Sequence, residues 1–166
     1  TVRPGPHSKH ASIPSAVMVR DTLKLTKYLR EAKSAIYGGK VTIDGVKRKS
    51  LHHGIGLMDV IELSGVSDIY RLVPQGGRVL KPLKIPNAEK SKKLVKLTSK
   101  TTIKGKKTQL GFHDGRSMIS DTDIDVGDSC LIQIPEQKIL EVIKLEKGAQ
   151  VIVTRGINAG QVGTVE

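Results

Sequence analysis

Basic side chains are the residues in this sequence best suited to bind a ligand. Lys and Arg number 28 against 16 Asp and Glu, which gives a formal net charge of +12. Ammonium and guanidinium groups neutralise phosphates and release condensed counterions, so a strongly basic chain is suited to bind a polyanion. The chemistry expected of these side chains is therefore binding and not bond cleavage.

The charge is unevenly distributed along the chain. Residues 1–49 hold eleven Lys or Arg against three acids, a net of +8, and residues 76–107 hold eleven against one, a net of +10. Residues 108–146 hold three Lys or Arg against eight acids, a net of −5. Two basic regions and one acidic region predict a molecule with a basic side that binds a polyanion and another side that does not.

The residue pattern gives little support for a metal site or a catalytic site. His7-x-x-His10, the His52-His53 pair and Cys130 lack the spacing of a zinc ligand set. The sequence contains no GxxxxGK[ST] loop, no GxSxG turn and no recognisable nucleophile-base pair. We therefore expect no metal, no cofactor, no small-molecule substrate and no catalysis.

The acidic run from Asp121 to Gly127 has some features of a calcium loop. An EF-hand needs its glycine directly after the third acid and a Glu at the twelfth position. Here Val126 precedes the glycine, and Ile132 stands at the twelfth position. A solvated acidic turn is the better prediction.

Two short helices are predicted to position the first group of cations. Pro14 suits the first turn of a helix, whose apolar face is expected to hold Ala16, Val19 and Leu23. The cations expected on another face of this helix are Arg20, Lys24 and Lys27. A second helix is expected from about Lys27 to Tyr37. Its apolar stripe consists of Leu29, Ala32 and Ile36, and Gly38-Gly39 is expected to end it.

A hairpin and further strands are predicted to complete this first unit. Val41 and Ile43 alternate with polar residues before the tight-turn pair Asp44-Gly45. The stretches GLMDVIEL and DIYRLV are each expected to form a short strand. In front of the first helix, residues 1–13 are predicted to form an irregular basic arm, which is mobile or held only by incidental contacts in the absence of a partner.

A second, all-β unit is expected beyond a boundary at Gln75-Gly76-Gly77. Its predicted strands are RVLKPLKIP, the two halves of KLVKLTSKTTIKGKKTQLGFHDG, SCLIQI and KILEVIKLE. Turn residues separate these strands at Gly105, Asp114-Gly115, Gly127-Asp128 and Pro135-Glu136. The fold class predicted for the whole chain is α+β, with domains at 14–75 and 76–146 and a short β segment at 147–166.

Composition also narrows the setting and the kind of partner. A single cysteine excludes a disulfide framework within the chain and agrees with a reducing compartment. No apolar run approaches the roughly twenty residues needed to cross a bilayer, and residues 1–14 lack the apolar core of a signal peptide. With one Phe, three Tyr and no Trp, structured RNA is a better expected partner than a single strand that stacks on aromatic rings.

Several motifs, taken in order, resemble one ribosomal protein family. REAKSAIYGGKVTIDGVKRK followed by GLMDVIEL resembles the S4 RNA-binding domain, a small helix-helix-hairpin module. GPHSKHASIP before it and LGFHDGRSMISDTDIDVGDSCLIQI after it resemble the S4e family of small-subunit ribosomal proteins. The run from Gly156 to Gly163, within GAQVIVTRGINAGQVGTVE, is similar to a KOW motif, which joins two strands of a small SH3-like barrel.

The resemblance implies a structural constituent of the small ribosomal subunit, acting in translation on cytoplasmic ribosomes. Its implied partners are small-subunit ribosomal RNA and neighbouring ribosomal proteins, with no membrane. The RNA-binding residues implied in the first domain are Arg20, Lys24, Lys27, Arg30, Lys33, Lys40, Lys47 and Arg48. In the KOW stretch they are Arg155, Asn158 and Gly160, although a tight loop between strands explains the glycine equally well. The family pattern continues with more strands than this chain has after Gly163, so a C-terminally truncated KOW barrel is expected.

Two alternatives of other classes remain at this point. One is a subunit of an RNA-modifying enzyme that uses an S4 domain to hold its substrate, and turnover on RNA would reveal it. The other is a KOW-bearing transcription or processing factor, which would purify with a polymerase instead of ribosomes.

Overall fold

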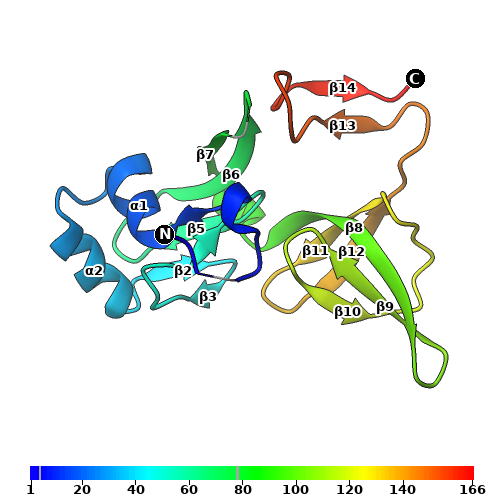
Figure 1. The fold of residues 1–166 in the computed structure, drawn as a ribbon, viewed down its shortest axis with the longest axis horizontal. Coiled ribbons are helices and arrows are strands. Elements are labelled where there is room, and N and C mark those ends of the chain that lie inside the picture. The colour runs from blue at the N-terminus through cyan, green and yellow to red at the C-terminus, as the bar shows by residue number, and fades with distance from the viewer. Residues whose placement is uncertain (4, 78) are drawn as a thin grey trace.

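Two five-stranded antiparallel sheets form the body of the molecule in the computed structural model, which describes residues 1–3, 5–77 and 79–166 (Figure 1). The first sheet has the strand order β3-β2-β5-β6-β7, and the second has the order β10-β9-β8-β11-β12. The two α-helices among the described residues lie beside the first sheet. The predicted α+β class is confirmed.

The second predicted helix and the hairpin form as expected. Helix α2 (Leu29–Tyr37) buries Ala32 and Ile36 against the sheet. The hairpin joins β2 (Val41–Ile43) to β3 (Val46–Lys47) through Asp44 and Gly45. Both turn residues have positive φ, 51° and 76°, which is the requirement of a type I′ turn and the reason for the Asp-Gly pair.

The first predicted helix differs from its expectation. The α-helical part, α1, covers only Ser15–Val17, and η2 (Met18–Thr22) continues it as a π-helix. The Leu23 N–H reaches back to the Met18 carbonyl, so the turn is one residue wider than an α-helical turn. Lys24 then adopts a φ of 54° and ends the helical stretch. The prediction that Lys24 and Lys27 lie on a face of this helix is therefore wrong, because both follow its end.

The N-terminal arm is packed against the body. Val2 and His7 are buried, and the Arg3 N–H donates to the His52 carbonyl. Strand β1 (Ile13–Pro14) pairs with β4 (Gly54–Ile55). The expectation of merely incidental contacts fails at His7 because its partner is a buried carboxylate, Asp59.

The first sheet runs past the expected boundary. Strands β5 (Val60–Leu63), β6 (Ile69–Gln75) and β7 (Val79–Ile85) pair in sequence. Gln75 is thus the last residue of β6, and Gly76 and Gly77 lie in the connection to β7, so this stretch does not divide the chain. The 3-10 turn η3 (Asn87–Glu89) leads from β7 to the second sheet.

The second sheet is built around one long strand. Strand β8 (Lys92–Ile103) pairs with β11 (Ser129–Gln133) in its first half and with β9 (Lys107–Phe112) in its second half. Strands β10 (Ser117–Ile119) and β12 (Lys138–Ile143) form the edges.

Strands β5 and β6 of the first sheet serve two cores. Their side chains alternate between the faces of the sheet. Ile61 and Leu72 join α2 in the first core, whereas Val60 and Ile69 join Val95, Leu97, Leu110, Phe112, Cys130 and Ile132 in the second core. The two cores therefore lie on opposite faces of β5 and β6, which join the two halves of the molecule.

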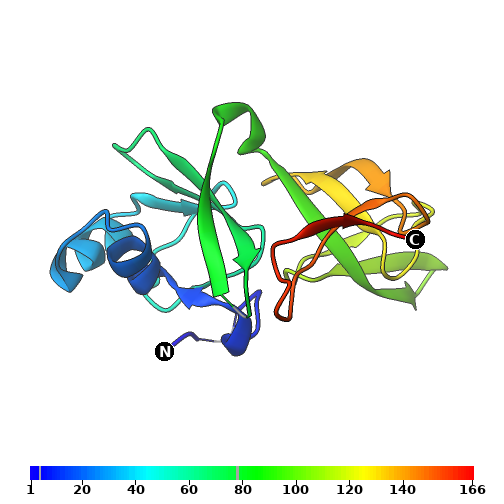
Figure 2. The ribbon, with the colours of Figure 1, turned by 90° about the horizontal axis from the view of Figure 1, so that it is seen from above.

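The last two strands form a hairpin of their own, β13 (Gln150–Ile152) and β14 (Val162–Thr164) (Figure 2). The loop between them contacts the turn between β6 and β7, where the Gly76 N–H donates to the Ala159 carbonyl and the Gly77 N–H donates to the Gly156 carbonyl. Ala159 is buried. This loop therefore rests on the first sheet, at the turn between β6 and β7.

Candidate nucleic-acid interface

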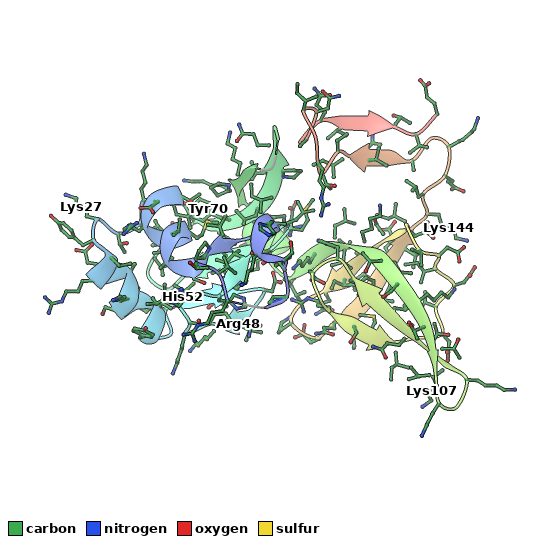
Figure 3. The ribbon with its side chains drawn as sticks, viewed as in Figure 1. Lys27, Arg48, His52, Tyr70, Lys107 and Lys144 are labelled. Carbon is green, nitrogen blue, oxygen red and sulfur yellow. The ribbon has the colours of Figure 1, made fainter. Side chains whose placement is uncertain are left out.

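Helix α2 presents a cationic face to solvent. Ala32 and Ile36 are fully buried, so the helix can present Arg30 and Lys33 only on its outer side, together with Lys27 just before it. The Glu31 carboxylate accepts hydrogen bonds from the backbone N–H groups of Lys27 and Tyr28, at 2.9 and 3.2 Å, which fixes the start of the helix. Figure 3 shows Lys27 at the end of the molecule farthest from the second sheet.

The β2–β3 hairpin adds a second group of exposed cations next to this helix. Its exposed basic residues are Lys40, Lys47, Arg48 and Lys49. A Cβ placed on Gly39, which follows α2, would lie 3.4 Å from the Lys49 Cε, so the hairpin cations approach the end of the helix. We call Lys27, Arg30, Lys33, Lys40, Lys47, Arg48 and Lys49 the helix-hairpin surface.

Arg20 stands apart from the other candidates. Its guanidinium Nε and Nη2 donate to the two carboxylate oxygens of Asp21 at 2.6 and 2.8 Å. This bidentate pair already satisfies the geometry with which Arg recognises a phosphate. Lys24, in contrast, is exposed beside the end of η2.

Two tyrosines accompany the cations of α2. Tyr28 is 68% exposed and Tyr37 is 58% exposed. Tyr37 follows Lys33 by four residues, so both project from the same side of the helix. The low aromatic count of the sequence concealed this placement, and two rings remain available to stack on unpaired bases.

The predicted residues of the KOW stretch fall into two groups. Arg155 and Asn158 are exposed on the β13–β14 loop. Gly160 has a φ of 92°, and a Cβ there would lie 2.5 Å from the Pro74 carbonyl oxygen. The close approach that this glycine permits is to the backbone of the protein itself.

A buried ionic cluster joins the two halves of the molecule, and the sequence did not reveal it. The Lys93 ammonium on β8 lies 2.6 Å from Asp44, 2.6 Å from Asp59 and 3.0 Å from Asp114. Arg116 Nη2 donates to Asp44 at 2.7 Å and Arg116 Nε to Asp114 at 2.8 Å. The His7 ring completes the cluster and lies within hydrogen-bonding distance of Asp59. The Asp44 Oδ1 also accepts a hydrogen bond from the Val60 N–H.

The charges in this cluster stabilise one another. Burial alone would raise the pKa of Asp59, but the hydrogen bond with His7 and the charge of Lys93 hold that pKa well below its usual range. Burial would lower the pKa of Lys93, yet the carboxylates of Asp59, Asp44 and Asp114 raise it instead. The charged forms of Asp59 and Lys93 are thus favoured at neutral pH, because each lies beside groups of opposite charge.

Several residues of this cluster lie in the sequence motifs that carry the family resemblance. His7 belongs to GPHSKH, Asp44 to the VTIDG turn, and Asp114 and Arg116 to HDGR. A polar residue such as Asp44, placed beside the turn glycine, was explained by the turn alone. Only the tertiary structure brings these segments together, since Lys93 is 34 residues from Asp59 and 49 from Asp44.

Other kinds of site are not evident in the described part of the chain. No group of three or more His, Cys, Asp or Glu in residues 1–3, 5–77 and 79–166 is arranged to hold a metal ion. Asp121, Asp123 and Asp125 are exposed, as predicted for a solvated turn. None of the helices described in the structure is long and apolar enough to cross a membrane.

Comparison with known proteins gives a consistent result. The model of the ribosomal family S4e matches residues 66–139. Small ribosomal subunit protein eS4 from Methanothermobacter thermautotrophicus is 43% identical over 165 residues, covering 98% of this chain and 67% of that protein. The eS4 protein of Korarchaeum cryptofilum is 42% identical over 164 residues, covering 98% and 70%. The crystal structure of the 30S ribosomal protein S4e from Thermoplasma acidophilum is similar with a TM-score of 0.82 and 37% identity, covering 93% of this chain and 80% of that one.

Proposed function

This chain belongs to the ribosomal family S4e, and from that premise we propose that it is a structural constituent of the small ribosomal subunit that binds ribosomal RNA. The observation that carries the RNA-binding part is the helix-hairpin surface. Seven exposed Lys and Arg side chains gather there on two adjoining elements. Cations of this kind contact phosphates and orient a protein on folded RNA without reading its sequence.

The RNA-contacting residues that we propose are Lys24, Lys27, Arg30, Lys33, Lys40, Lys47 and Arg48, with Arg155 and Asn158 as contacts on the KOW loop. Arg20 and Gly160 keep a place only as weaker candidates. The Arg20 guanidinium must leave Asp21 to meet a phosphate, and Gly160 is occupied by its contact with Pro74. An RNA duplex is recognised mainly through shape and backbone, which suits a surface with many cations, and the two aromatic rings suit unpaired bases beside a duplex.

This role requires no catalytic step. Among the described residues, the buried charged groups of the ionic cluster are paired with one another, and the buried Asp128 accepts backbone N–H groups of Asp125 and Leu145. The partners are small-subunit ribosomal RNA and adjacent ribosomal proteins, and the place of action is the cytoplasmic ribosome.

Sedimentation tests the proposal directly. The native protein, followed by antibody or tag in a lysate fractionated on a sucrose gradient, is expected to comigrate with small subunits and with full ribosomes at moderate salt. It should leave them only as the salt concentration rises to a level that strips ribosomal proteins. Comigration with an RNA polymerase, or turnover of RNA by the purified protein, would instead support one of the two alternative classes.

A further inference from the structure

The ribbon formed by the distal parts of β8 and β9 projects away from the rest of the molecule. Residues 99–108 form this ribbon, and Figure 1 shows it extending beyond the second sheet. It contains four lysines, Lys100, Lys104, Lys106 and Lys107, and no acidic residue. We call residues 99–108 the lysine ribbon.

The core of the second sheet does not account for this extension. In the lysine ribbon only Ile103 and Thr108 are partly buried, and the remaining residues are exposed. A segment that buries so little apolar surface contributes little to folding. Its composition of lysines and hydroxyl side chains therefore calls for another explanation.

The lysine ribbon is nevertheless ordered before any partner arrives. Regular pairing continues to its tip, with Lys100 opposite Leu110, Thr102 opposite Thr108 and Ile103 opposite Lys107. Gly105 and Lys106 close the turn with φ values of 83° and 57°. A paired ribbon loses less conformational entropy on binding than a flexible loop of the same charge, so its cations are preorganised.

Three lysines at the tip have no ion-pair partner within the described residues. Only Lys100, at the base, is engaged, with its ammonium donating to the Ile124 carbonyl at 3.0 Å and lying 3.7 Å from Asp125. Lys104, Lys106 and Lys107 share a five-residue tip with Gly105 and Ile103. Three unpaired ammonium groups so close together repel one another unless a polyanion neutralises them.

RNA is the polyanion that this shape fits best. A membrane-binding element would carry Trp, Phe or Leu anchors beside its cations, and the lysine ribbon has none. Lysines on a two-stranded ribbon can contact the phosphates of a folded RNA, and threonine hydroxyls offer further hydrogen bonds to its backbone.

We propose that the lysine ribbon is a second RNA-contacting element, which binds an RNA segment different from the one contacted by the helix-hairpin surface. This inference rests on the proposed function and adds a site to it. The two elements lie at opposite ends of the molecule, as the positions of Lys27 and Lys107 show (Figure 3). Because the two elements are so far apart, we expect them to contact two different segments of the RNA.

A matched pair of triple variants tests the contribution to binding. One replaces Lys104, Lys106 and Lys107 by Ala, and the control replaces three other exposed lysines, Lys138, Lys144 and Lys147, so that net charge falls equally. Affinity for small-subunit ribosomal RNA is measured as a function of salt. The ribbon variant should lower the magnitude of the log-log slope by about 2 to 3, because each lost phosphate contact removes about 0.7 to 0.9. The control should leave the slope nearly unchanged.

Directed cleavage locates the contact. Cys130 is fully buried, so an iron-EDTA tether can be attached selectively to a cysteine introduced by Lys107→Cys, or by Lys27→Cys in a second protein. The two tethers are expected to cleave separate sets of nucleotides. Coincident cleavage would overturn the idea of a second site.

The outcomes separate the two proposals. If the wild-type protein fails to bind ribosomal RNA, the proposed function itself fails. If wild type binds and both triple variants behave alike, the function stands and the lysine ribbon is only a solvated extension. If the ribbon variant binds RNA normally but is lost from assembled subunits, the ribbon contacts a protein, and the inference is overturned.

Discussion

Single residues decide how the two sheets are held together, and Lys93 is the clearest example. Its ammonium is withdrawn from water and surrounded by three carboxylates. An unpaired charge in such a place is costly, whereas a charge with complete partners is tolerated. The surface cations differ, because water solvates their charged groups and no desolvation cost has to be offset.

Replacing Lys93 by Met is expected to destabilise the protein strongly. The substitution leaves Asp44, Asp59 and Asp114 with fewer cations among them, and removing one partner of a buried ion pair costs about 3 to 5 kcal/mol. Urea unfolding at neutral pH measures the loss. The control is Lys84→Met, because Lys84 pairs with Asp68 on the surface, and its unfolding midpoint should hardly move. Equal effects of the two substitutions would contradict the role given to the cluster.

Stability is expected to fall in acid because of the same cluster. The pKa values of Asp59 and Asp114 are lowered in the folded protein, although burial opposes their ionisation. At Asp59 the effect of burial is outweighed by His7 and Lys93. At Asp114 it is outweighed by Lys93 and Arg116. A carboxylate whose folded pKa is depressed contributes stability above its unfolded pKa and loses that contribution as the pH falls toward its folded pKa. The free energy of unfolding should therefore decline from about pH 4 downward, by as much as about 1.4 kcal/mol per pH unit for each such group. Urea titrations at pH 7, 5, 4 and 3 measure the decline. Asp59→Asn should make it shallower, and an unchanged slope in that variant would refute the assignment.

Exposed single residues were easier to predict than buried ones. The exposure of Arg30 and Lys33 follows from their spacing relative to Ala32 and Ile36, which is local information. The role of His7 does not, because its partner Asp59 is 52 residues away. A charged residue inside a strand, such as Lys93, looks like a solvent-facing residue until the opposing carboxylates are in place.

At the scale of elements, helix α2 and the β2–β3 hairpin form one basic unit whose shape was largely predictable. Helical periodicity and the Asp-Gly turn are strong local signals, and both were confirmed in the fold. The π-helical form of η2, which buries its own Met18 and Val19, carries no local sequence signal that distinguishes it from an α-helix. Local propensity cannot anticipate such a response to packing.

Arg30→Ala with Lys33→Ala is expected to weaken binding to structured ribosomal RNA without affecting the fold. Both side chains are exposed on the outer side of α2, and the loss of two phosphate contacts should reduce the salt slope by about 1 to 2. Salt titrations on one RNA fragment measure the change. Asp123→Ala with Asp125→Ala serves as the control and should not weaken binding. If the Arg30 and Lys33 double variant kept the wild-type slope, this face of the helix would be no more than solvated.

Gly160→Ala is expected to release the β13–β14 loop from the first sheet. The new Cβ would clash with the Pro74 carbonyl, and the alanine would have to keep the positive φ of this position. This backbone strain destabilises the folded state by about 1 to 3 kcal/mol. Hydrogen exchange of the Gly76 and Gly77 amides, which donate to this loop, should accelerate. Gly163→Ala is the matched control, because nothing lies within 4 Å of its Cβ position. Equal protection in both variants would show that the loop does not depend on this contact.

At the scale of the whole molecule, the first sheet is shared between two cores, so the two halves should not unfold separately. Val60 and Ile69 lie in the second core although their strands belong to the first sheet. The ionic cluster crosses the same boundary. The sequence suggested two units divided near Gln75, because apolar alternation does not tell which neighbour a strand face will cover.

A single cooperative transition is therefore expected in denaturant. Tyr28, Tyr37 and Tyr70 all belong to the first half, and the buried Cys130 belongs to the second, so the protein carries a natural reporter in each. Tyrosine fluorescence and the reactivity of the Cys130 thiol should give coincident unfolding curves. Thiol modification at a lower urea concentration than the fluorescence change would show that the halves unfold independently.

The junction between the halves has a consequence for affinity. Because Val60 and Ile61 of β5 are buried in different cores and Lys93 bridges the two sheets, the lysine ribbon and the helix-hairpin surface are held at a constant separation. Once one of them is bound to RNA, the effective concentration of the other is high only for an RNA segment that lies at the matching distance. For RNA segments at other distances it is close to zero. Two individually weak contacts then add their free energies only on an RNA folded so that both segments stand at that span. The protein should accordingly discriminate between folded and partly folded RNA of the same sequence, and loosening the joint through Lys93 should reduce that discrimination before it reduces binding to either segment alone.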